Sequence, residues 1–282
     1  MTEPRKVHVV TDSTSDLPQV LRNQYDITIV PLTVTFGSQS FIDGVEITPS
    51  EFLDRLTHAD ALPTTSQPPA PDFARVFTEV LNRDQDVVCI TLSSELSGTF
   101  NAARLAAQEF DSSRIRIIDS RATTMQLGWI AVDAARAAEK GTDVETVAAR
   151  ATGAINRANC FAVLRTLDYV YKGGRIGRAS HLVGSALGIK PVLNIVDGLV
   201  TPVERVRTWK KALARATELA ATTGNPSDFA VLHSDNLPDA RATADKLRQQ
   251  FPDANIVIDW AGSAIMTYTG PGAIGIMTLS QP

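Results

Sequence analysis

Short runs rich in β-branched residues alternate with amphipathic segments along the first half of the chain, and this alternation restricts the folds that it can adopt. Parallel strands need long crossover connections, which are usually helices, so the pattern favours βα units around a mainly parallel sheet. The expected strands are residues 7–11, 27–35, 87–92 and 115–119. The expected helices are residues 15–24, 49–58, 72–83, 100–110 and 125–140.

The pattern changes after about residue 159, where a strand is followed by a Gly-rich segment and by a hairpin-like stretch around Asp197-Gly198. In this part we expect strands at residues 160–164, 229–233, 256–260 and 273–279, a hairpin at 192–203, and helices at 206–222 and 239–251. With 282 residues, the chain is long enough for two compact units. We therefore predict a two-lobed α/β fold. Residues 1–159 form an N-terminal lobe on a mainly parallel sheet, and residues 160–282 form a C-terminal α/β lobe.

Two helix starts carry the Thr-x-x-Glu pattern of a capping box. In such a box the threonine hydroxyl accepts from the backbone N–H three residues later, and the glutamate reaches back to the N–H of the threonine. The first box runs from Thr48 to Glu51, with Pro49 in the first turn, and the second runs from Thr142 to Glu145. Both predict helix starts at these positions.

Composition excludes several classes of protein. The formal net charge of −4 leaves no global basic field for a phosphate backbone, so we expect no nucleic acid partner, although a local basic patch is compatible with it. Cys89 and Cys160 lie in apolar runs and the four histidines lack metal-ligand spacing, so we expect no disulfide, metal or cofactor. The chain shows no signal-peptide core and no uncharged stretch of membrane-span length, so we expect a cytoplasmic protein without stable membrane insertion.

Two polar loops are candidates for ligand binding. In residues 63–69, prolines flank a run of hydroxyl and amide side chains, which suggests a stiff ligand-facing loop or, alternatively, a Ser/Thr-rich linker. Residues 92–99 end a strand and open a helix, where ligands bind in doubly wound sheets, and helix N–H groups with the Ser97 and Thr99 hydroxyls would suit an anion. Alternatively, Ser97 only caps the helix. Residues 11–16, also at a strand end, fit caps and turns better than a metal or phosphate site.

Signatures of nucleotide binding and of hydrolysis are weak. The Gly-rich residues 172–177 and 269–275 match neither a Walker A loop nor a dinucleotide fingerprint after the first strand. Ser97, His233 and Asp235 could be combined into a triad, but no Gly-x-Ser-x-Gly elbow surrounds Ser97. These observations favour a binding protein over an enzyme.

Seven segments, in their order along the chain, make the prediction more specific. They are residues 11–16 (TDSTSD), 30–32 (VPL), 63–68 (PTTSQP), 92–99 (LSSELSGT), 168–176 (DYVYKGGRI), 189–192 (IKPV) and 269–272 (TGPG). From about residue 6 to residue 279 the chain resembles the DegV family, which includes the FakB subunits of bacterial fatty acid kinase. The resemblance implies the two-lobed α/β fold of that family.

The resemblance also implies a function. A long-chain fatty acid would lie buried between the lobes, with its carboxylate held by Thr65 and Ser97. The further head-group shell would be Ser66, Gly98, Thr99 and Tyr268. The chain would be a non-enzymatic carrier, and a separate fatty acid kinase subunit would phosphorylate the bound carboxylate to an acyl phosphate for phospholipid metabolism. The family usually has histidine where Tyr268 stands, and a tyrosine donates a hydrogen bond but does not become a cation near neutral pH.

A local cluster of basic residues supports a partner. We expect a docking face for the kinase formed by Lys172, Arg175, Arg205 and Arg207. The alternative is that these are ordinary solvated charges. The rival functions are a Ser-dependent hydrolase and a small-molecule kinase subunit, since the fold family also resembles the substrate-binding half of dihydroxyacetone kinase.

Overall fold

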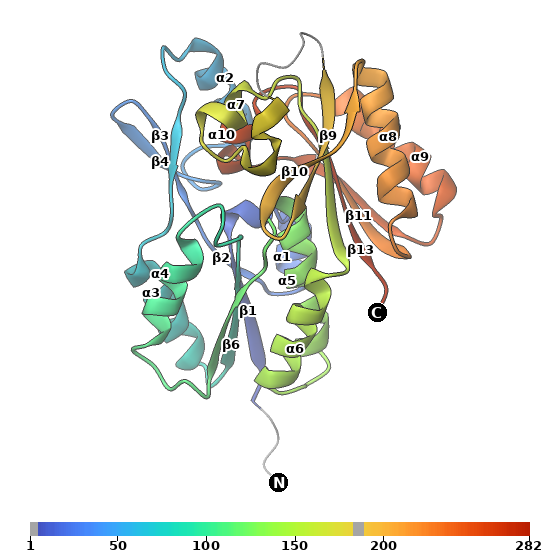
Figure 1. Ribbon diagram of the computed structural model, residues 1–282. Helices are drawn as coiled ribbons and strands as arrows, with labels where there is room; N and C mark the ends of the chain where they lie inside the picture. The colour runs from blue at the N-terminus through green and yellow to red at the C-terminus, as the bar shows by residue number, and fades with distance from the viewer. Residues whose placement is uncertain (1–4, 183–188) are drawn as a thin grey trace.

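A four-stranded parallel sheet lies in the N-terminal part of the computed structural model, which describes residues 5–182 and 189–282 (Figure 1). Residues 1–4 of the predicted N-terminal lobe and 183–188 of the predicted C-terminal lobe lie outside the described residues. The strand order is β2-β1-β6-β7, formed by β1 (Val7–Asp12), β2 (Thr28–Val30), β6 (Asp86–Thr91) and β7 (Ile115–Asp119). The parallel sheet predicted from the βα pattern is confirmed.

Helices cover both faces of this sheet, which explains why its strands are continuous apolar runs. On one face Val10 and Cys89 pack against α3 (Ala70–Leu81) and α4 (Thr99–Ala107). On the other face Val9, Val88 and Ile90 pack against α5 (Thr124–Ala138) and α6 (Val144–Ile155). All six residues of β1 and of β6 are buried as a result.

A six-stranded mixed sheet forms the second part of the fold. Its order is β10-β9-β8-β13-β11-β12, formed by β8 (Ala158–Val163), β9 (Lys190–Val196), β10 (Leu199–Val206), β11 (Pro226–His233), β12 (Asn255–Trp260) and β13 (Ile274–Ser280). One face of this sheet packs on α8 (Trp209–Thr222) and α9 (Leu237–Gln250). The hairpin predicted around Asp197-Gly198 is confirmed as the antiparallel pair β9 and β10.

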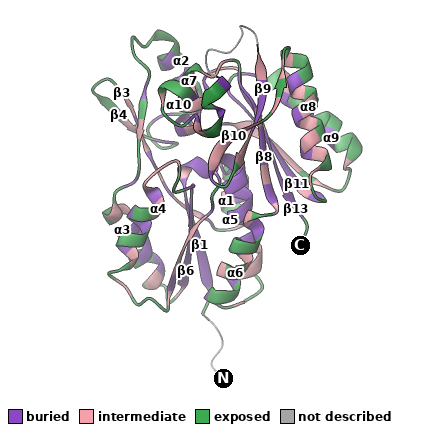
Figure 2. Ribbon diagram, viewed as in Figure 1, coloured by how far each residue is buried: buried purple, intermediate pink, exposed green. Residues whose placement is uncertain are grey.

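The other face of the six-stranded sheet packs on α5, which therefore lies between the two sheets. Twelve of the fifteen residues of α5 are buried, and Figure 2 shows the helix as the buried centre of the molecule. Residues of β1, α5, β8 and β13 belong to one hydrophobic cluster. This α/β architecture confirms the predicted fold class, whereas a division of the chain at residues 159 and 160 stays our proposal.

A third, small antiparallel sheet lies beside these two, with the order β4-β3-β5. Its strands are β3 (Thr33–Phe36), β4 (Gln39–Ile42) and β5 (Thr64–Ser66). The prediction of one strand over residues 27–35 was wrong, because the chain leaves the parallel sheet after β2. Pro31 has no N–H for a ladder, and the Leu32 N–H donates to the Ser13 hydroxyl at 3.0 Å instead.

Two predicted helices begin later in the chain than we expected. Residues 15–24 do not form one helix: η1 (Ser13–Ser15) is a short 3-10 turn that ends at Asp16 in the left-handed region, and α1 (Gln19–Gln24) begins after Pro18. The helix predicted from residue 206 begins at Trp209, since β10 continues to Val206 and Thr208 caps the helix. By contrast α2 (Pro49–His58) has the predicted bounds.

The two predicted capping boxes had different outcomes. At α2 the box is confirmed, since Thr48 accepts from the Glu51 N–H and Glu51 accepts from the Thr48 N–H. At α6 the prediction was wrong by one residue: Asp143 is the N-cap and accepts from the Thr146 N–H at 2.8 Å. Thr142 instead donates to the Ala137 carbonyl, and Glu145 pairs with Arg116. An aspartate is as good an N-cap as a threonine, so the pattern alone could not choose.

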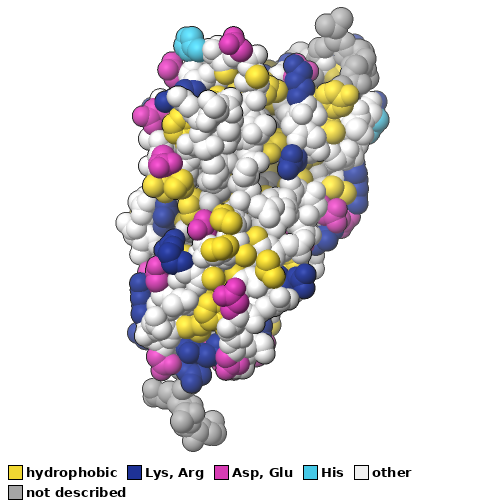
Figure 3. All heavy atoms as spheres, turned by 90° about the vertical axis from the view of Figure 1, so that its left-hand side faces the viewer, with side chains coloured by type: hydrophobic (Ala, Val, Ile, Leu, Met, Phe, Trp, Pro, Cys, Tyr) yellow, Lys and Arg dark blue, Asp and Glu magenta, His cyan; other side chains and the backbone are white. Residues whose placement is uncertain are grey.

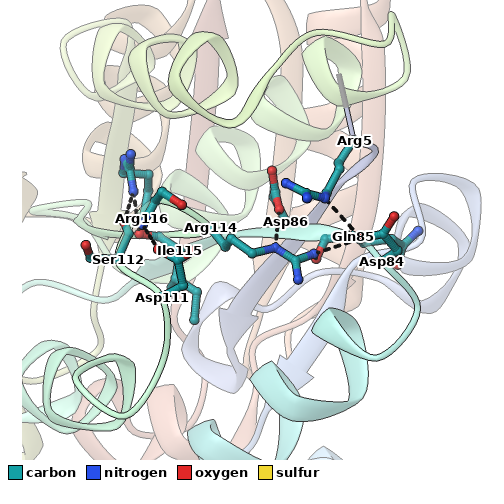
Figure 4. Close-up of polar contacts among 10 residues, drawn as sticks. Arg5, Asp84, Gln85, Asp86, Asp111, Ser112, Arg114, Ile115 and Arg116 are labelled. Atoms are coloured by element: carbon teal, nitrogen blue, oxygen red, sulfur yellow. Dashed lines mark hydrogen bonds and ion pairs between the residues drawn. The ribbon is translucent and has the colours of Figure 1, made fainter. Parts of the chain in front are cut away.

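A polar network lies at the end of the parallel sheet where the strands β6 and β7 begin (Figure 4). Arg114 donates to the Asp86 carboxylate at 2.8 Å and to the Gln85 carbonyl at 3.1 Å, and Arg5 donates to Asp84 at 3.0 Å. Ligands bind at the opposite end of a parallel sheet, next to the carboxyl ends of its strands. The described residues include no helix of the length and apolarity that a bilayer crossing requires.

Candidate functional site

A cavity of about 360 Å³ lies where β1 and β6 end and face the six-stranded sheet. The loop after β6, the strand β5 and the start of α5 line one side of it. Strands β8 to β10 and the helices α7 (Asp168–Lys172) and α10 (Ser263–Thr269) line the other side. The cavity thus occupies the carboxyl ends of parallel strands, which is the usual ligand position in open α/β sheets.

Most of the cavity wall is apolar. The apolar lining residues are Leu32, Leu92, Leu96, Leu164, Val170, Leu193, Ile195, Val200, Ala162, Ala264 and Ile265. They come from at least five elements that are distant in sequence, so the apolar wall exists only in the folded chain. Such a wall suits a hydrocarbon ligand.

One end of the cavity is polar, and Thr65 and Tyr268 meet there. The hydroxyl oxygens of Thr65 and Tyr268 are 2.6 Å apart and form a hydrogen bond. Thr65 lies on the middle strand position of β5, where it pairs with Val34, and Tyr268 lies on α10. The two predicted head-group residues, 203 positions apart in the chain, are therefore direct neighbours.

The loop after β6 brings Ser97 and Gly98 to the same cavity. The Ser97 hydroxyl lies 2.9 Å from the Thr99 hydroxyl, while Gly98 is the N-cap of α4. Ser97 therefore precedes the cap position and lines the cavity. Thr99 is fully buried and adjoins the site only through its bond to Ser97, and Ser66 lines the cavity beside Thr65.

Gly98 is in close contact with Gln67, a residue that the sequence did not single out. A Cβ added to Gly98 would lie 2.1 Å from Gln67 Oε1, so a side chain at this position would displace the Gln67 amide. The Gln67 amide thus packs over the start of α4 and lines the cavity. The signal for it was present in the Pro-flanked Ser-Gln-Pro segment, but proximity to Gly98 depends on the fold.

Arg175 lies at the polar end, although we predicted it as part of a docking face. Its Nε donates to the Leu96 carbonyl at 3.2 Å, and its Cζ lies 5.3 Å from the centroid of the Tyr268 ring. Among the described residues that line the cavity, Arg175 is the only charged one. Its side chain is exposed, so it stands at the cavity mouth.

The other predicted docking residues have different positions. Lys172 is exposed at the end of α7, three residues before Arg175. Arg205 is exposed on β10 opposite Pro191, whereas Val200, which lines the cavity, lies opposite Ile195. Leu193 also lines the cavity and lies opposite Pro202, so Arg205 is three residues along β10 from this pair, or about 10 Å, and neither Arg205 nor Arg207 lines the cavity. On the face seen in Figure 3, basic and acidic side chains are interspersed.

The β9–β10 hairpin contributes four residues to the cavity lining, Leu193, Asn194, Ile195 and Val200. The tip residues Asp197 and Gly198 both have positive φ, as a tight hairpin turn requires. The Ser93 hydroxyl donates to the Gly198 carbonyl at 3.0 Å, which attaches the hairpin to the loop after β6. The hairpin and the Ser97 loop are therefore held in one unit.

A buried carboxylate supports the cavity floor. Asp12 accepts from the Thr14 N–H at 3.0 Å and from the Leu92 N–H at 2.7 Å, so it ties the ends of β1 and β6 together. Thr14 and Leu92 line the cavity, whereas Asp12 is fully buried behind them. Burial raises the pKa of Asp12 to about 6, because desolvation opposes its charged form.

Hydrolytic chemistry finds little support at this site. Among the described lining residues of the cavity there is no histidine. His233 lies on β11 with its ring 4.6 Å from that of Trp260, and its Nδ1 accepts from the Asn236 N–H. Burial lowers the pKa of His233, so it is held neutral within the structure. Within the described ranges, no group of three or more His, Cys, Asp or Glu side chains is placed to hold a metal ion.

Comparison with known families and proteins gives a consistent result. Residues 6–281 match the family model described as "Uncharacterised protein, DegV family". A DegV domain-containing protein of Streptomyces coelicolor is 38% identical over 281 residues, which covers 98% of this chain and 99% of that protein. The match therefore extends over the whole length of both chains.

Two solved structures are similar in both fold and sequence. One is described as showing fatty acid binding of a DegV family protein from Thermus thermophilus, with a TM-score of 0.91, 33% identity, and coverage of 98% of this chain and 100% of that chain. The other is DegV, a fatty acid binding protein from Bacillus subtilis, with a TM-score of 0.90, 30% identity and the same coverage. The fold and the polar-ended cavity thus occur in a chain that is similar to fatty-acid-binding proteins.

Proposed function

The chain belongs to the DegV family, and from this premise we propose that it binds a long-chain fatty acid in the cavity between its two sheets. The observation that carries the proposal is a mainly apolar cavity wall that also bears a connected group of polar side chains, Thr65, Tyr268 and Arg175. The tail would lie along the apolar wall, and the carboxylate would lie at Thr65 and Ser97. Fatty acid binding by similar solved structures supports the same ligand class.

The energetics of such a ligand fit this division of the cavity. Burial of each CH₂ contributes about 0.8 kcal/mol, so about fifteen methylenes supply on the order of 12 kcal/mol before entropy losses. A carboxylate moved out of water needs donors in place of its hydration. The tail therefore supplies affinity, and the polar end makes burial of the head group tolerable.

The Thr65–Tyr268 pair can supply one such donor. In a hydrogen bond between two hydroxyls, one O–H is used and the other remains free to donate. The free O–H would point to the carboxylate, with Ser97 as a second donor from the opposite loop. Arg175 at the mouth adds a cation near the head group, and it would also suit the phosphate of an acyl phosphate.

A carrier role follows from this arrangement. We infer that a separate fatty acid kinase docks at the mouth, where a carboxylate oxygen attacks the terminal phosphate of ATP and ADP leaves. The carrier would hold and orient the carboxylate, and the kinase would supply the nucleotide site. Lys172 and Arg175 adjoin the mouth and are the stronger docking candidates, whereas Arg205 and Arg207 would extend the interface along β10.

Thr65→Val and Ser97→Ala test the head-group site. Each removes a donor to a charged acceptor, worth roughly 1.5–3 kcal/mol, so we expect each to weaken binding of stearic acid by about tenfold to a hundredfold. Titration calorimetry measures the affinity, and circular dichroism checks the fold. Thr64→Val, an exposed neighbour on β5, is the matched control. Unchanged affinity in both test variants contradicts the assignment.

Native mass spectrometry followed by organic extraction tests the ligand class directly. A lipid that is buried in the cavity should survive purification and be released only by the solvent. Turnover of an ester or of ATP by this chain alone would instead identify a hydrolase or a small-molecule kinase subunit, and it would contradict the carrier role.

A further inference from the structure

The short helix α10 forms a large share of the cavity wall. Ala264, Ile265, Tyr268 and Thr269 on this helix all line the cavity. In Figure 1 α10 lies beside α7, and it also packs on α2, on η1 and on the small sheet. The position of Tyr268 at the polar end therefore depends on how α10 is held.

Asp16 holds the beginning of α10. Its Oδ1 accepts from the Gly262 N–H at 3.0 Å, and its Oδ2 accepts from the Thr124 hydroxyl at 2.7 Å. Gly262 is the N-cap of α10, and Thr124 is the first residue of α5. One carboxylate thus connects the loop after β1 with the starts of two helices that line the cavity.

Asp43 lies beside the same helix end. It follows β4, and its buried side chain places Oδ2 3.9 Å from the position of a Cβ added to Gly262. The backbone of Asp43 is itself fixed, because its N–H donates to the Leu32 carbonyl at 2.9 Å. The first N–H groups of a helix have no partner within the helix, and the Asp16 carboxylate satisfies one of them at the start of α10.

The local backbone is built around these contacts. Asp16 has a φ of 49° and Thr124 a φ of 51°, so two non-glycine residues in the left-handed region meet in one hydrogen bond. For the β-branched Thr124 this conformation is a clear outlier. A Cβ on Gly262 would lie 2.6 Å from Asp16 Oδ1, so glycine is needed for the close approach.

Both carboxylates are buried where their charge is costly. Desolvation raises the pKa of Asp16 well above its ordinary value, and it raises the pKa of Asp43 as well. Neither has a basic partner within salt-bridge distance among the described residues, so helix N–H groups and hydroxyls do the work of a counter-charge. A neutral amide of the same shape would avoid this cost, which indicates that the stronger hold of a carboxylate on N–H groups is what these positions require.

We propose that Asp16 is a positioning residue that clamps α10 onto the N-terminal segments, with Asp43 packed beside the same helix end, and that this clamp sets how fast a bound fatty acid leaves the cavity. The inference rests on the proposed function. Release of the clamp lets α10 move away from the head group, since its start is attached to the loop after β1 by the Asp16 carboxylate. The two aspartates do not line the fatty acid cavity, so they act through α10.

The test compares release rates of a fluorescent analogue of stearic acid by stopped flow. In Asp16→Ala we expect release about tenfold or more faster than in the wild type, because two bonds to a carboxylate are lost. In Asp16→Asn, the amide oxygen keeps an acceptor for the Gly262 N–H, whereas the Nδ2 can only donate to the Thr124 hydroxyl, so we expect a release rate between those of the wild type and Asp16→Ala. Gly262→Ala, which displaces the Asp16 side chain without removing it, should also release faster.

Asp133→Ala is the matched control. Asp133 is buried on α5 and pairs with Arg150 at 2.8 Å, and neither residue belongs to α10. Loss of the Asp133 side chain should therefore lower stability and leave the release rate unchanged. Hydrogen exchange should show faster exchange of the α10 amides in Asp16→Ala and not in the control. A wild type that does not bind the analogue refutes the proposed function. If Asp16→Ala and Gly262→Ala bind the analogue and both release it at the wild-type rate, the clamp is refuted.

Discussion

Tyr268 is the residue at which this chain departs from the pattern of the family that it resembles. A histidine there could become a cation, whereas the tyrosine supplies a hydroxyl that is hydrogen-bonded to the hydroxyl of Thr65. The proposed head-group site thus contains two hydroxyls that share one hydrogen bond, with the Arg175 guanidinium above the ring of Tyr268.

Because these hydroxyls act as a pair, their removal should be non-additive. We expect Tyr268→Phe to weaken binding of stearic acid, and we expect the double variant with Thr65→Val to lose less than the sum of the two single losses, by about 1 kcal/mol. Calorimetric titration at several pH values between 5 and 8 measures all four proteins. If Tyr268→Phe binds with unchanged affinity, the tyrosine only packs between the elements.

Asp12 makes a second prediction at the residue scale. Burial raises its pKa in the folded protein to about 6 from the ordinary 3.8, so the folded state binds a proton more tightly than the unfolded state does. Its contribution to stability is therefore fully present below about pH 4 and is lost as the pH rises through about 6.

Asp12→Asn should remove this dependence. Between pH 4 and pH 7.5, the free energy of unfolding of the wild type should fall by on the order of 3 kcal/mol more than that of the variant. The variant should also be less stable by a constant amount at both pH values, because its amide faces an N–H donor. Urea denaturation at both pH values gives the difference. A wild type and variant whose stabilities change in parallel would show that Asp12 is not the group responsible.

At the scale of elements, the capping box of α2 gives a direct test of local sequence reasoning. Thr48→Ala removes the hydroxyl that accepts from the Glu51 N–H, so the free energy of unfolding should fall by about 1 kcal/mol. Thr57→Ala, near the end of the same helix, should have a smaller effect, since alanine has the higher helix propensity. Equal losses from both variants would mean that the box contributes little.

Periodic elements were predictable because the signal lies in their own residues. Strand β7 and helix α2 have the predicted bounds, and the other long strands and helices lie within about three residues of them. The exceptions have local causes. Pro31 separates β2 from β3, and Pro18 with the left-handed Asp16 delays the start of α1.

Elements that depend on distant partners were not predictable. β4 and β5 are short and largely polar, and they become strands only by pairing with β3. α10 is seven residues long and begins where Asp16 accepts from the Gly262 N–H. The motifs predicted Thr65, Ser97 and Tyr268 as cavity residues. The contribution of Gln67 and the position of Arg175 at the mouth depend on the folded chain, so the motifs could not predict them.

At the scale of the whole molecule, the carrier role predicts a charged approach to a kinase. We expect Arg175→Glu to slow acyl-phosphate formation about tenfold at low salt, because local charge guides association and Arg175 stands at the mouth. Since it also lines the cavity, this variant should bind stearic acid more weakly. Arg205→Glu tests docking alone, because Arg205 does not line the cavity.

Lys246→Glu is the control for these charge reversals. It changes the net charge by the same amount on α9, on the face of the six-stranded sheet away from the cavity. Rates measured with the kinase at two ionic strengths separate steering from contact, since steering weakens in salt. An unaltered rate for Arg205→Glu removes that residue from the interface.

The place of β13 at the centre of the six-stranded sheet has a consequence for biosynthesis. β13 pairs with β8 on one side and β11 on the other, so the sheet stays in two separate halves until residues 274–280 have left the ribosome. Until then α5 lacks one of the strands that cover this side of it, although β8 is made soon after α5. The nascent chain therefore carries a partly covered apolar helix for more than a hundred residues of synthesis, which is the kind of surface that chaperones bind. The cavity wall also includes α10, which follows β12 in the chain, so the wall is completed late in synthesis.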